Sequence, residues 1–385
     1  MLRPRPLSCG FVRKSLLPSS SPPTSAIHPR IFFSRRRPFG SSSAQSPPPP
    51  PPPSYQEYGR PPVRVLGPLL WCLGAASAVY LGCAAYDVRR DAEALKRHLP
   101  AGARIASYDD LDAGSRDPFS FWGRRGGHHA PPPPATAPWD PTAMIGLWQS
   151  QSDTRKLTIG AIGANAGIYG ACRVVPSTWY HFAHAPAWPS NYTLFTSMFG
   201  HGGPWHLALN MYALYNFAEP VAVSRTFRRR YPSPDTDADP NPSRRRGVSG
   251  SGPHLAAFYL STGILANLAQ HLAGIWPTPA GRAIPALGAS GAIMALLGAF
   301  GASYPDERVG IVLVPVSFPA GQALAGIALF EAYGLFVGKW MRLGHAAHLA
   351  GLALGAAYVH FEGNRVLWEP ARRLAFAQMR RLHVV

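Results

Sequence analysis

A serine lies in a charge-free stretch that otherwise contains only small and apolar residues. Residues 286–296 read ALGASGAIMAL, with Ser290 between Ala289 and Gly291. Small residues allow transmembrane helices to approach closely, so a serine here can serve packing alone. A serine hydroxyl can also act as a nucleophile when a general base lies beside it. The choice between the two roles depends on polar residues elsewhere in the chain.

A second apolar stretch carries histidine and asparagine. Residues 199–217 read FGHGGPWHLALNMYALYNF, and the Gly203-Pro204 pair is expected to begin a helix because proline is tolerated in a first turn. His206 and Asn210 are four residues apart, so they share one face of that helix. An amide and an imidazole on one face can donate hydrogen bonds to an oxyanion.

A third apolar stretch, residues 344–361, reads GHAAHLAGLALGAAYVHF. His348, Gly351 and Gly355 share one helical face, and glycines on a face permit close approach of a neighbouring helix. His345, three residues before His348, is either a partner of that histidine or a residue at the membrane boundary. The three stretches together hold the parts of an acyl-transfer site: a nucleophile, a general base and oxyanion donors.

Carboxylates are scarce in the apolar runs between residues 156 and 362. Glu331 lies within one run and Glu219 lies near the end of another. The sequence therefore predicts a Ser–His dyad without a third acid that orients the histidine. The chain also has no His-Glu-x-x-His motif, which disfavours a zinc peptidase.

A metal site is conceivable from ligand type alone, but sites made only of histidines are rare in lipid and no carboxylate is available to support one. We expect neither a metal nor a cofactor. The histidines that such a site would use are His201, His206, His345 and His348.

Apolar runs predict the elements that position these residues. Residues 65–86 contain 22 residues without a charge, and a bilayer core requires about 20. Six further spans come after a hydrophilic stretch, so the predicted fold is an all-α polytopic membrane protein: a six-helix bundle preceded by one extra transmembrane helix. The six expected spans are 157–175, 200–222, 254–276, 286–304, 320–338 and 345–361.

Composition divides the chain into five predicted regions. Residues 1–62 are read as a mitochondrial transit peptide and a proline-rich linker, because eight basic residues occur in the first forty and no acid precedes Glu57. The other regions are the first transmembrane helix (63–86), a hydrophilic linker (87–155), the six-helix core (156–362) and a basic tail (363–385). The net charge of +18 is concentrated in the leader and in loops, so we expect no nucleic-acid partner.

The motifs resemble the rhomboid family of intramembrane serine proteases. Three strings carry the resemblance: His201-x4-His206-x3-Asn210, Gly288-Ala289-Ser290-Gly291, and Ala347-His348-x2-Gly351-x3-Gly355. The extra span ahead of the core and the arginine-rich leader resemble the mitochondrial inner-membrane subgroup of that family.

The resemblance implies Ser290 as nucleophile and His348 as general base. It implies that the Asn210 side chain, His206 and the backbone N–H of Ser290 hold the oxyanion, with His201 shaping that pocket. The glycines that would pack around the site are Gly288, Gly291, Gly351 and Gly355.

We therefore expect a multi-pass intramembrane serine endopeptidase of the mitochondrial inner membrane. Its partners would be membrane lipid and single-pass transmembrane substrates, and the sequence leaves the oligomeric state open. One alternative is a catalytically silent rhomboid-like protein that binds transmembrane clients; such proteins usually lack the serine or the histidine, and both are present here. A transporter would require inverted repeats, which the sequence does not show.

Overall fold

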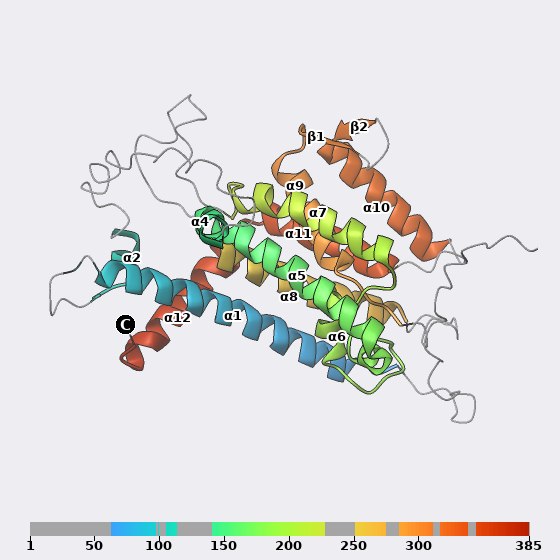
Figure 1. Cartoon of the computed structure of the whole chain (residues 1–385), viewed down its shortest axis with the longest axis horizontal. Helices are drawn as coiled ribbons and strands as arrows, with labels where there is room; N and C mark the ends of the chain where they lie inside the picture. The colour runs from blue at the N-terminus through green and yellow to red at the C-terminus, as the bar shows by residue number, and fades with distance from the viewer. Residues whose placement is uncertain are drawn as a thin grey trace, which may run out of the picture. The chain divides into compact units, whose positions relative to one another are not determined.

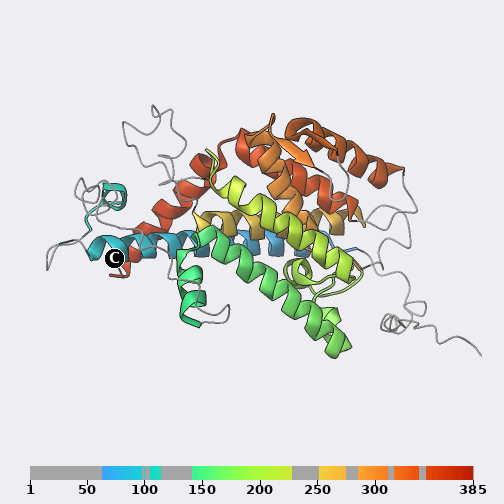
Figure 2. The same ribbon diagram turned by 45° about the horizontal axis from the view of Figure 1, so that its top comes forward.

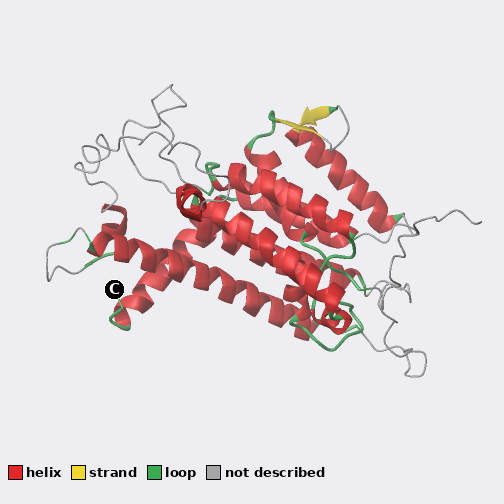
Figure 3. Cartoon of the chain, in the orientation of Figure 1, coloured by secondary structure: helices red, strands yellow, loops and turns green. Residues whose placement is uncertain are grey.

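The computed structural model describes residues 63–97, 99, 105–113, 141–227, 251–274, 285–310, 316–337 and 344–384. The leader and linker predicted for residues 1–62 lie outside the described residues. Helices dominate the described part, and β1 (Arg308–Gly310) pairs with β2 (Ser317–Pro319) in an antiparallel hairpin (Figure 3).

The long helices match the predicted apolar runs. Within the described residues, α1 alone is long and apolar enough to cross a membrane by length and composition, while α9 and α10 are shorter apolar helices. The long helices are α1 (Leu66–Lys96), α5 (Asp153–Val174), α7 (Pro204–Ala222), α8 (Gly252–Ala273), α9 (Ser290–Ser303), α10 (Ala320–Phe336) and α11 (His345–His360).

Several short elements connect or extend the long helices. They are α2 (Asp109–Ala113), α4 (Pro141–Ser150), α6 (Thr193–Thr196), α12 (Glu369–Arg381), the 3₁₀ turns Pro176–His181 and Ser197–Phe199, and the π turn Asn364–Trp368.

Local sequence explains where several helices begin. α7 starts at Pro204, which confirms the prediction from the glycine-proline pair. The Ser152 hydroxyl accepts a hydrogen bond from the backbone N–H of Arg155 at the start of α5, and Ser251 does the same for His254 at the start of α8. These side chains satisfy N–H groups that a first helical turn leaves without a partner.

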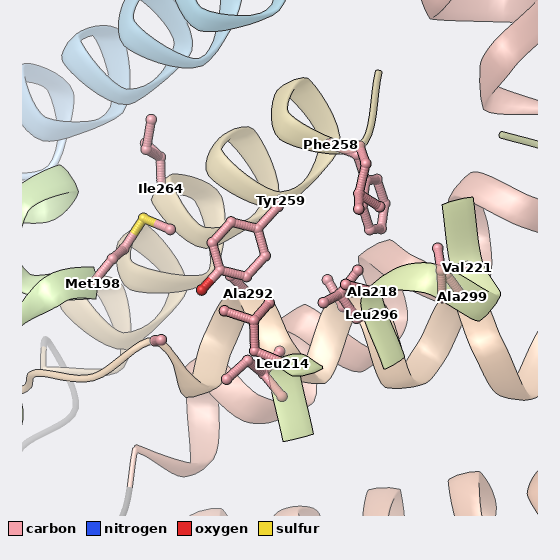
Figure 4. Close-up of a cluster of buried hydrophobic side chains, with 14 of the residues drawn as sticks. Met198, Leu214, Ala218, Val221, Phe258, Tyr259, Ile264, Ala292, Leu296 and Ala299 are labelled. Carbon is pink, nitrogen blue, oxygen red and sulfur yellow. The ribbon is translucent and has the colours of Figure 1, made fainter. Parts of the chain in front are cut away.

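Helix α8 lies at the centre of the packing and contacts α1, α9 and α11 (Figures 1 and 2). Its buried side chains Phe258, Tyr259 and Ile264 meet residues of α7 and α9 in the main apolar cluster. Figure 4 shows this cluster, with Leu214 from α7 and Leu296 from α9 beside the α8 residues. The core therefore joins the helices that carry the three sequence motifs.

The region after residue 86 and the C-terminal region pack together. α1 continues to Lys96, beyond the predicted end of its span at residue 86. Val88 and Ala92 of this extension form a second apolar cluster with Tyr108 and with Phe376 of α12. Parts of the predicted linker and of the predicted tail thus make one packed unit at the end of α1, where α12 lies against α1 (Figure 1).

A buried group of charges fastens α12 to α1. The Arg372 Nε atom lies 3.2 Å from an Asp87 carboxylate oxygen, and Nη2 lies 2.6 Å from Asp91. The side chains of Arg372 and Asp87 are 3% and 0% exposed. A buried charge is costly without its partner, so this pairing sets where α12 binds.

We predict that Arg372→Met lowers the free energy of unfolding by about 3 kcal/mol, because it removes the guanidinium nearest to the buried Asp87 carboxylate and leaves the longer contact to Arg90. Thermal unfolding in detergent measures the effect. The control is Arg373→Met, since the neighbouring guanidinium is 59% exposed beside Asp109 and should contribute little. The double variant Asp87→Asn/Arg372→Met should recover part of the loss; equal melting temperatures for Arg372→Met and Arg373→Met would contradict the assignment.

Candidate active site

Ser290 and His348 meet across the interface between α9 and α11. The Ser290 Oγ atom lies 2.7 Å from His348 Nε2, and both residues are half-buried. Ser290 is the first residue of α9, and His348 lies in the first turn of α11. This distance is that of a hydrogen bond through which a serine proton can pass to an imidazole.

Glycines bring the two helices close enough for that hydrogen bond. A Cβ atom at Gly351 would collide with the backbone oxygen of Gly291, and one at Gly355 would collide with the backbone oxygen of Ala295. Gly298 of α9 faces the backbone of Leu352 in the same way. The backbones of α9 and α11 therefore touch at these positions without intervening side chains.

Glu331 of α10 completes a chain of hydrogen bonds behind His348. Its Oε1 atom lies 2.9 Å from His348 Nδ1, and its Oε2 atom lies 2.6 Å from His345 Nδ1. The carboxylate is 4% exposed. The expectation that no acid orients the histidine is therefore wrong: the one carboxylate inside an apolar run of the core faces the base directly.

These contacts fix where the protons lie on the two imidazoles. A carboxylate accepts hydrogen bonds, so both Nδ1 atoms must carry the proton. The Nε2 atom of His348 is then a free acceptor for the Ser290 hydroxyl. Glu331 thus holds His348 in the tautomer that a general base requires.

His206 lies on the other side of Ser290. The backbone N–H of Gly202 donates to His206 Nδ1 over 3.3 Å, so the ring proton lies on Nε2. A Cβ atom at Gly288 would lie 3.0 Å from His206 Nε2 and 3.6 Å from Ser290 Oγ. Gly288 has φ of +131°, a conformation that favours glycine. The glycine therefore leaves the space between the His206 N–H and the Ser290 hydroxyl open.

Asn210 and His201 lie next to His206 but make different contacts. Asn210 Nδ2 donates to the carbonyl oxygen of His206, one turn earlier in α7, over 2.7 Å. His201 Nδ1 lies 3.3 Å from the Phe199 carbonyl oxygen, and its ring centroid lies 5.1 Å from that of His206. The structure thus brings His206 close to Ser290, while Asn210 and His201 each contact His206.

The start of α9 offers further donors beside the Ser290 hydroxyl. Ser290 begins the helix and no side chain caps it. The first N–H groups of a helix have no intrahelical acceptor and carry a partial positive charge. The Ser290 backbone N–H can therefore contribute to binding a negative oxygen.

The loop before Ser290 is anchored to the segment that comes after α5. His184 and Ala286 exchange two backbone hydrogen bonds of 2.9 and 2.7 Å. The His184 side chain lies 2.9 Å from His271 Nδ1, and His271 Nε2 donates to the Arg64 carbonyl oxygen over 2.7 Å. Burial, and then the neighbouring His271, lower the pKa of His184 to about 3, so it stays neutral at physiological pH. The site thus lies at the end of the bundle where α1 begins.

The roles of Glu331 and His345 could not be read from the sequence motifs. Glu331 precedes His348 by 17 residues and lies on another helix, so no local spacing joins the two. The only available signal was its rarity, because a carboxylate within an apolar run needs a partner.

Known proteins are similar to this chain over the region that carries the motifs. Residues 189–230 and 248–365 match the model of the Rhomboid domain. A mouse protein named presenilin-associated rhomboid-like protein, mitochondrial, is 30% identical over 227 residues, which cover 58% of this chain and 52% of the mouse protein. A zebrafish relative of the same name, form A, is 29% identical over 232 residues, covering 59% of this chain and 53% of its own length.

The yeast Rhomboid protein 1, mitochondrial, is 26% identical over 231 residues and covers 58% of each chain. This chain spans about half the length of the curated vertebrate relatives that it matches. All three relatives are named as mitochondrial, which together with the membrane domain supports a location in the mitochondrial inner membrane.

We predict that Gly355→Ala lowers the free energy of unfolding by about 1–3 kcal/mol, because the added methyl group pushes α11 away from Ala295. The same displacement should separate His348 from Ser290. Gly326→Ala in α10 is the matched control, since a Cβ there meets no atom within 4 Å. Melting temperature and labelling of Ser290 by a fluorophosphonate measure the two effects. Equal stability and labelling in both variants would refute the role of the glycine contact.

Proposed function

We propose that this chain is an intramembrane serine endopeptidase of the rhomboid family, and the similarity of residues 189–230 and 248–365 to the Rhomboid domain supports this. The observation that carries the proposal is the chain of hydrogen bonds from Ser290 through His348 to Glu331. A serine that serves only helix packing has no need of a neighbouring histidine in a fixed tautomer. A nucleophilic serine needs such a histidine as its general base.

In the first step the Ser290 oxygen attacks the carbonyl carbon of the scissile peptide bond. The hydroxyl proton moves to His348 Nε2 as the new C–O bond forms, and the carbonyl oxygen becomes an oxyanion. Glu331 stabilises the resulting imidazolium, because its negatively charged carboxylate accepts a hydrogen bond from the Nδ1–H of His348. Collapse of the intermediate breaks the C–N bond, and His348 returns the proton to the leaving amine.

The oxyanion would be held by the His206 Nε2–H and the backbone N–H of Ser290. Both donors lie around the space that Gly288 leaves open. The Asn210 amide carries a second N–H beyond the one that bonds the His206 carbonyl, and we propose that it is a further donor to the oxyanion. Donors fixed before the reaction stabilise the developing charge without reorganisation.

The acyl-enzyme is then hydrolysed: His348 accepts a proton from water as the water oxygen attacks the acyl carbon, and it returns that proton to the Ser290 oxygen as the ester C–O bond breaks. Water must reach the dyad from a membrane face because the lipid core holds none. The site lies at the end of the bundle where α1 begins, so we infer that water enters from that face.

We propose that α1 and the six helices α5, α7, α8, α9, α10 and α11 all span the membrane, giving seven spans. The helical bundle of the Rhomboid domain supports this arrangement. Substrates would be single-pass transmembrane proteins of the mitochondrial inner membrane, cut near one end of the span. Residues 1–62 would act as the import signal.

The first test of this function is cleavage of a single-span substrate by the purified protein in liposomes. We expect the wild type to cut within or beside the span, and Ser290→Ala and His348→Ala each to abolish cleavage, because each removes one end of the proton transfer. Mass spectrometry of the products locates the cut.

Two results would contradict the proposal. If wild type and both variants cleave equally, another site does the chemistry. If the wild type binds the substrate and never cuts it, the chain is a client-binding protein instead.

The role of Glu331 has its own prediction. Glu331→Gln removes the negative charge and replaces one acceptor oxygen by an amide NH₂ group, so that one of the two imidazole N–H groups faces another donor. We expect kcat to fall by about 10²- to 10⁴-fold with KM nearly unchanged, because the base loses its fixed tautomer. Glu219→Gln is the control, since Glu219 bonds to Ser152 near the far end of α7. A kcat for Glu331→Gln equal to that of Glu219→Gln would exclude the role.

A further inference from the structure

The His345 ring packs against the surface of α10, in a slot formed by Phe330, Glu331 and Gly334. Its imidazole is 5% exposed and lies against Gly334, where any Cβ atom would collide with three ring atoms. Phe330 makes an edge contact with the same ring, with centroids 6.1 Å apart. Phe330, Glu331 and Gly334 lie on one face of α10 because they are one, three and four residues apart.

The slot presents His345 to the oxygen of Glu331 that His348 does not use. Each carboxylate oxygen receives one imidazole N–H, at 2.6 Å from His345 and 2.9 Å from His348. A carboxylate that is buried needs both oxygens satisfied to remain charged. Since the Glu331 side chain is 4% exposed, water does not readily replace a missing donor.

We propose that His345 is a positioning residue, which keeps Glu331 ionised and oriented so that His348 stays in its basic tautomer. This inference rests on the proposed protease function and adds a fourth group to its proton network. His345 acts through Glu331 and touches neither Ser290 nor the scissile bond.

Removal of His345 would change where the protons of the network lie. Without its N–H, the buried Oε2 of Glu331 has no donor, so the carboxylate takes up a proton in neutral solution. The protonated carboxyl group then donates to His348 Nδ1, and the imidazole proton moves to Nε2. In that tautomer His348 cannot accept the Ser290 proton. Alkaline solution removes the extra proton and restores the base.

The same contact joins α10 to the site. Of the residues of α10, only Ala320, Glu331 and Gly334 are buried, and the last two both face His345. One imidazole therefore contacts both the buried carboxylate and the buried glycine in the second half of α10. A displacement of α10 would remove the carboxylate from His348.

The test compares His345→Leu with His345→Asn in the full-length protein. Leucine fills the slot without a donor, whereas the asparagine side-chain N–H can take the place of the imidazole Nδ1–H. His360→Leu is the matched control, because His360 is an exposed histidine at the other end of α11. For each variant, kcat and KM for a single-span substrate are measured from neutral to alkaline pH, together with the melting temperature.

We expect kcat of His345→Leu to fall about 100-fold at neutral pH, the lower end of what a general base contributes, with KM nearly unchanged. The deficit should narrow as the pH rises, and His345→Asn should recover most of the activity. A deficit that is independent of pH, or that asparagine does not relieve, would overturn the proposal. A kcat equal to that of His360→Leu would overturn it as well.

Gly334→Ala keeps the proposal testable if His345→Leu does not fold. The methyl group displaces the imidazole without removing it, so the same pH-dependent deficit is expected. A kcat for Gly334→Ala equal to that of the wild type at neutral pH would contradict the proposal. If the proposed protease function itself is wrong, the wild type will be no more active than Ser290→Ala. That result is distinct from a failure of the His345 proposal, in which the wild type is active.

Discussion

The direct contact between the backbones of α9 and α11 is the constraint on which the site depends. Glycines on both helices remove the side chains that would hold the axes apart, and the helices then approach until their backbone atoms touch. Only at that separation can the short Ser290 side chain reach His348. Both residues lie in the first turn of their helices, so the site forms at one end of this contact.

The electrostatic interactions of the site are strong because Glu331 is buried away from water. Glu331 is a charge in an environment with little water, and two imidazole N–H groups satisfy it. Interactions between charges and dipoles are stronger there than in water, so one carboxylate can fix the tautomer of one histidine and the position of another. On the opposite side, Gly202 fixes His206 as an N–H donor, and Gly288 leaves room between that donor and the nucleophile. The protons are thus arranged before a substrate binds.

Much of this arrangement could be predicted from sequence because helical spacing is regular. The offsets between His206 and Asn210, and between His348 and the two glycines, placed each set on one helical face. What spacing cannot supply is which faces meet. Glu331 was noticed as an unusual carboxylate, but its orientation toward His348 depends on how α10 packs against α11. Likewise, the end of α1 was predicted from hydropathy, yet the helix continues for ten residues because Asp87 and Arg372 pair and Phe376 packs there.

We propose that His348, oriented by Glu331, makes Ser290 nucleophilic. This is tested by the mass spectrum of the intact protein, and of its peptides, after treatment with a fluorophosphonate that carries no recognition element. We expect a single adduct on the peptide containing Ser290 in the wild type, no adduct in His348→Ala, and markedly slower labelling in Glu331→Gln. An adduct on a different serine, or equal labelling of Ser290 in all three proteins, would contradict it.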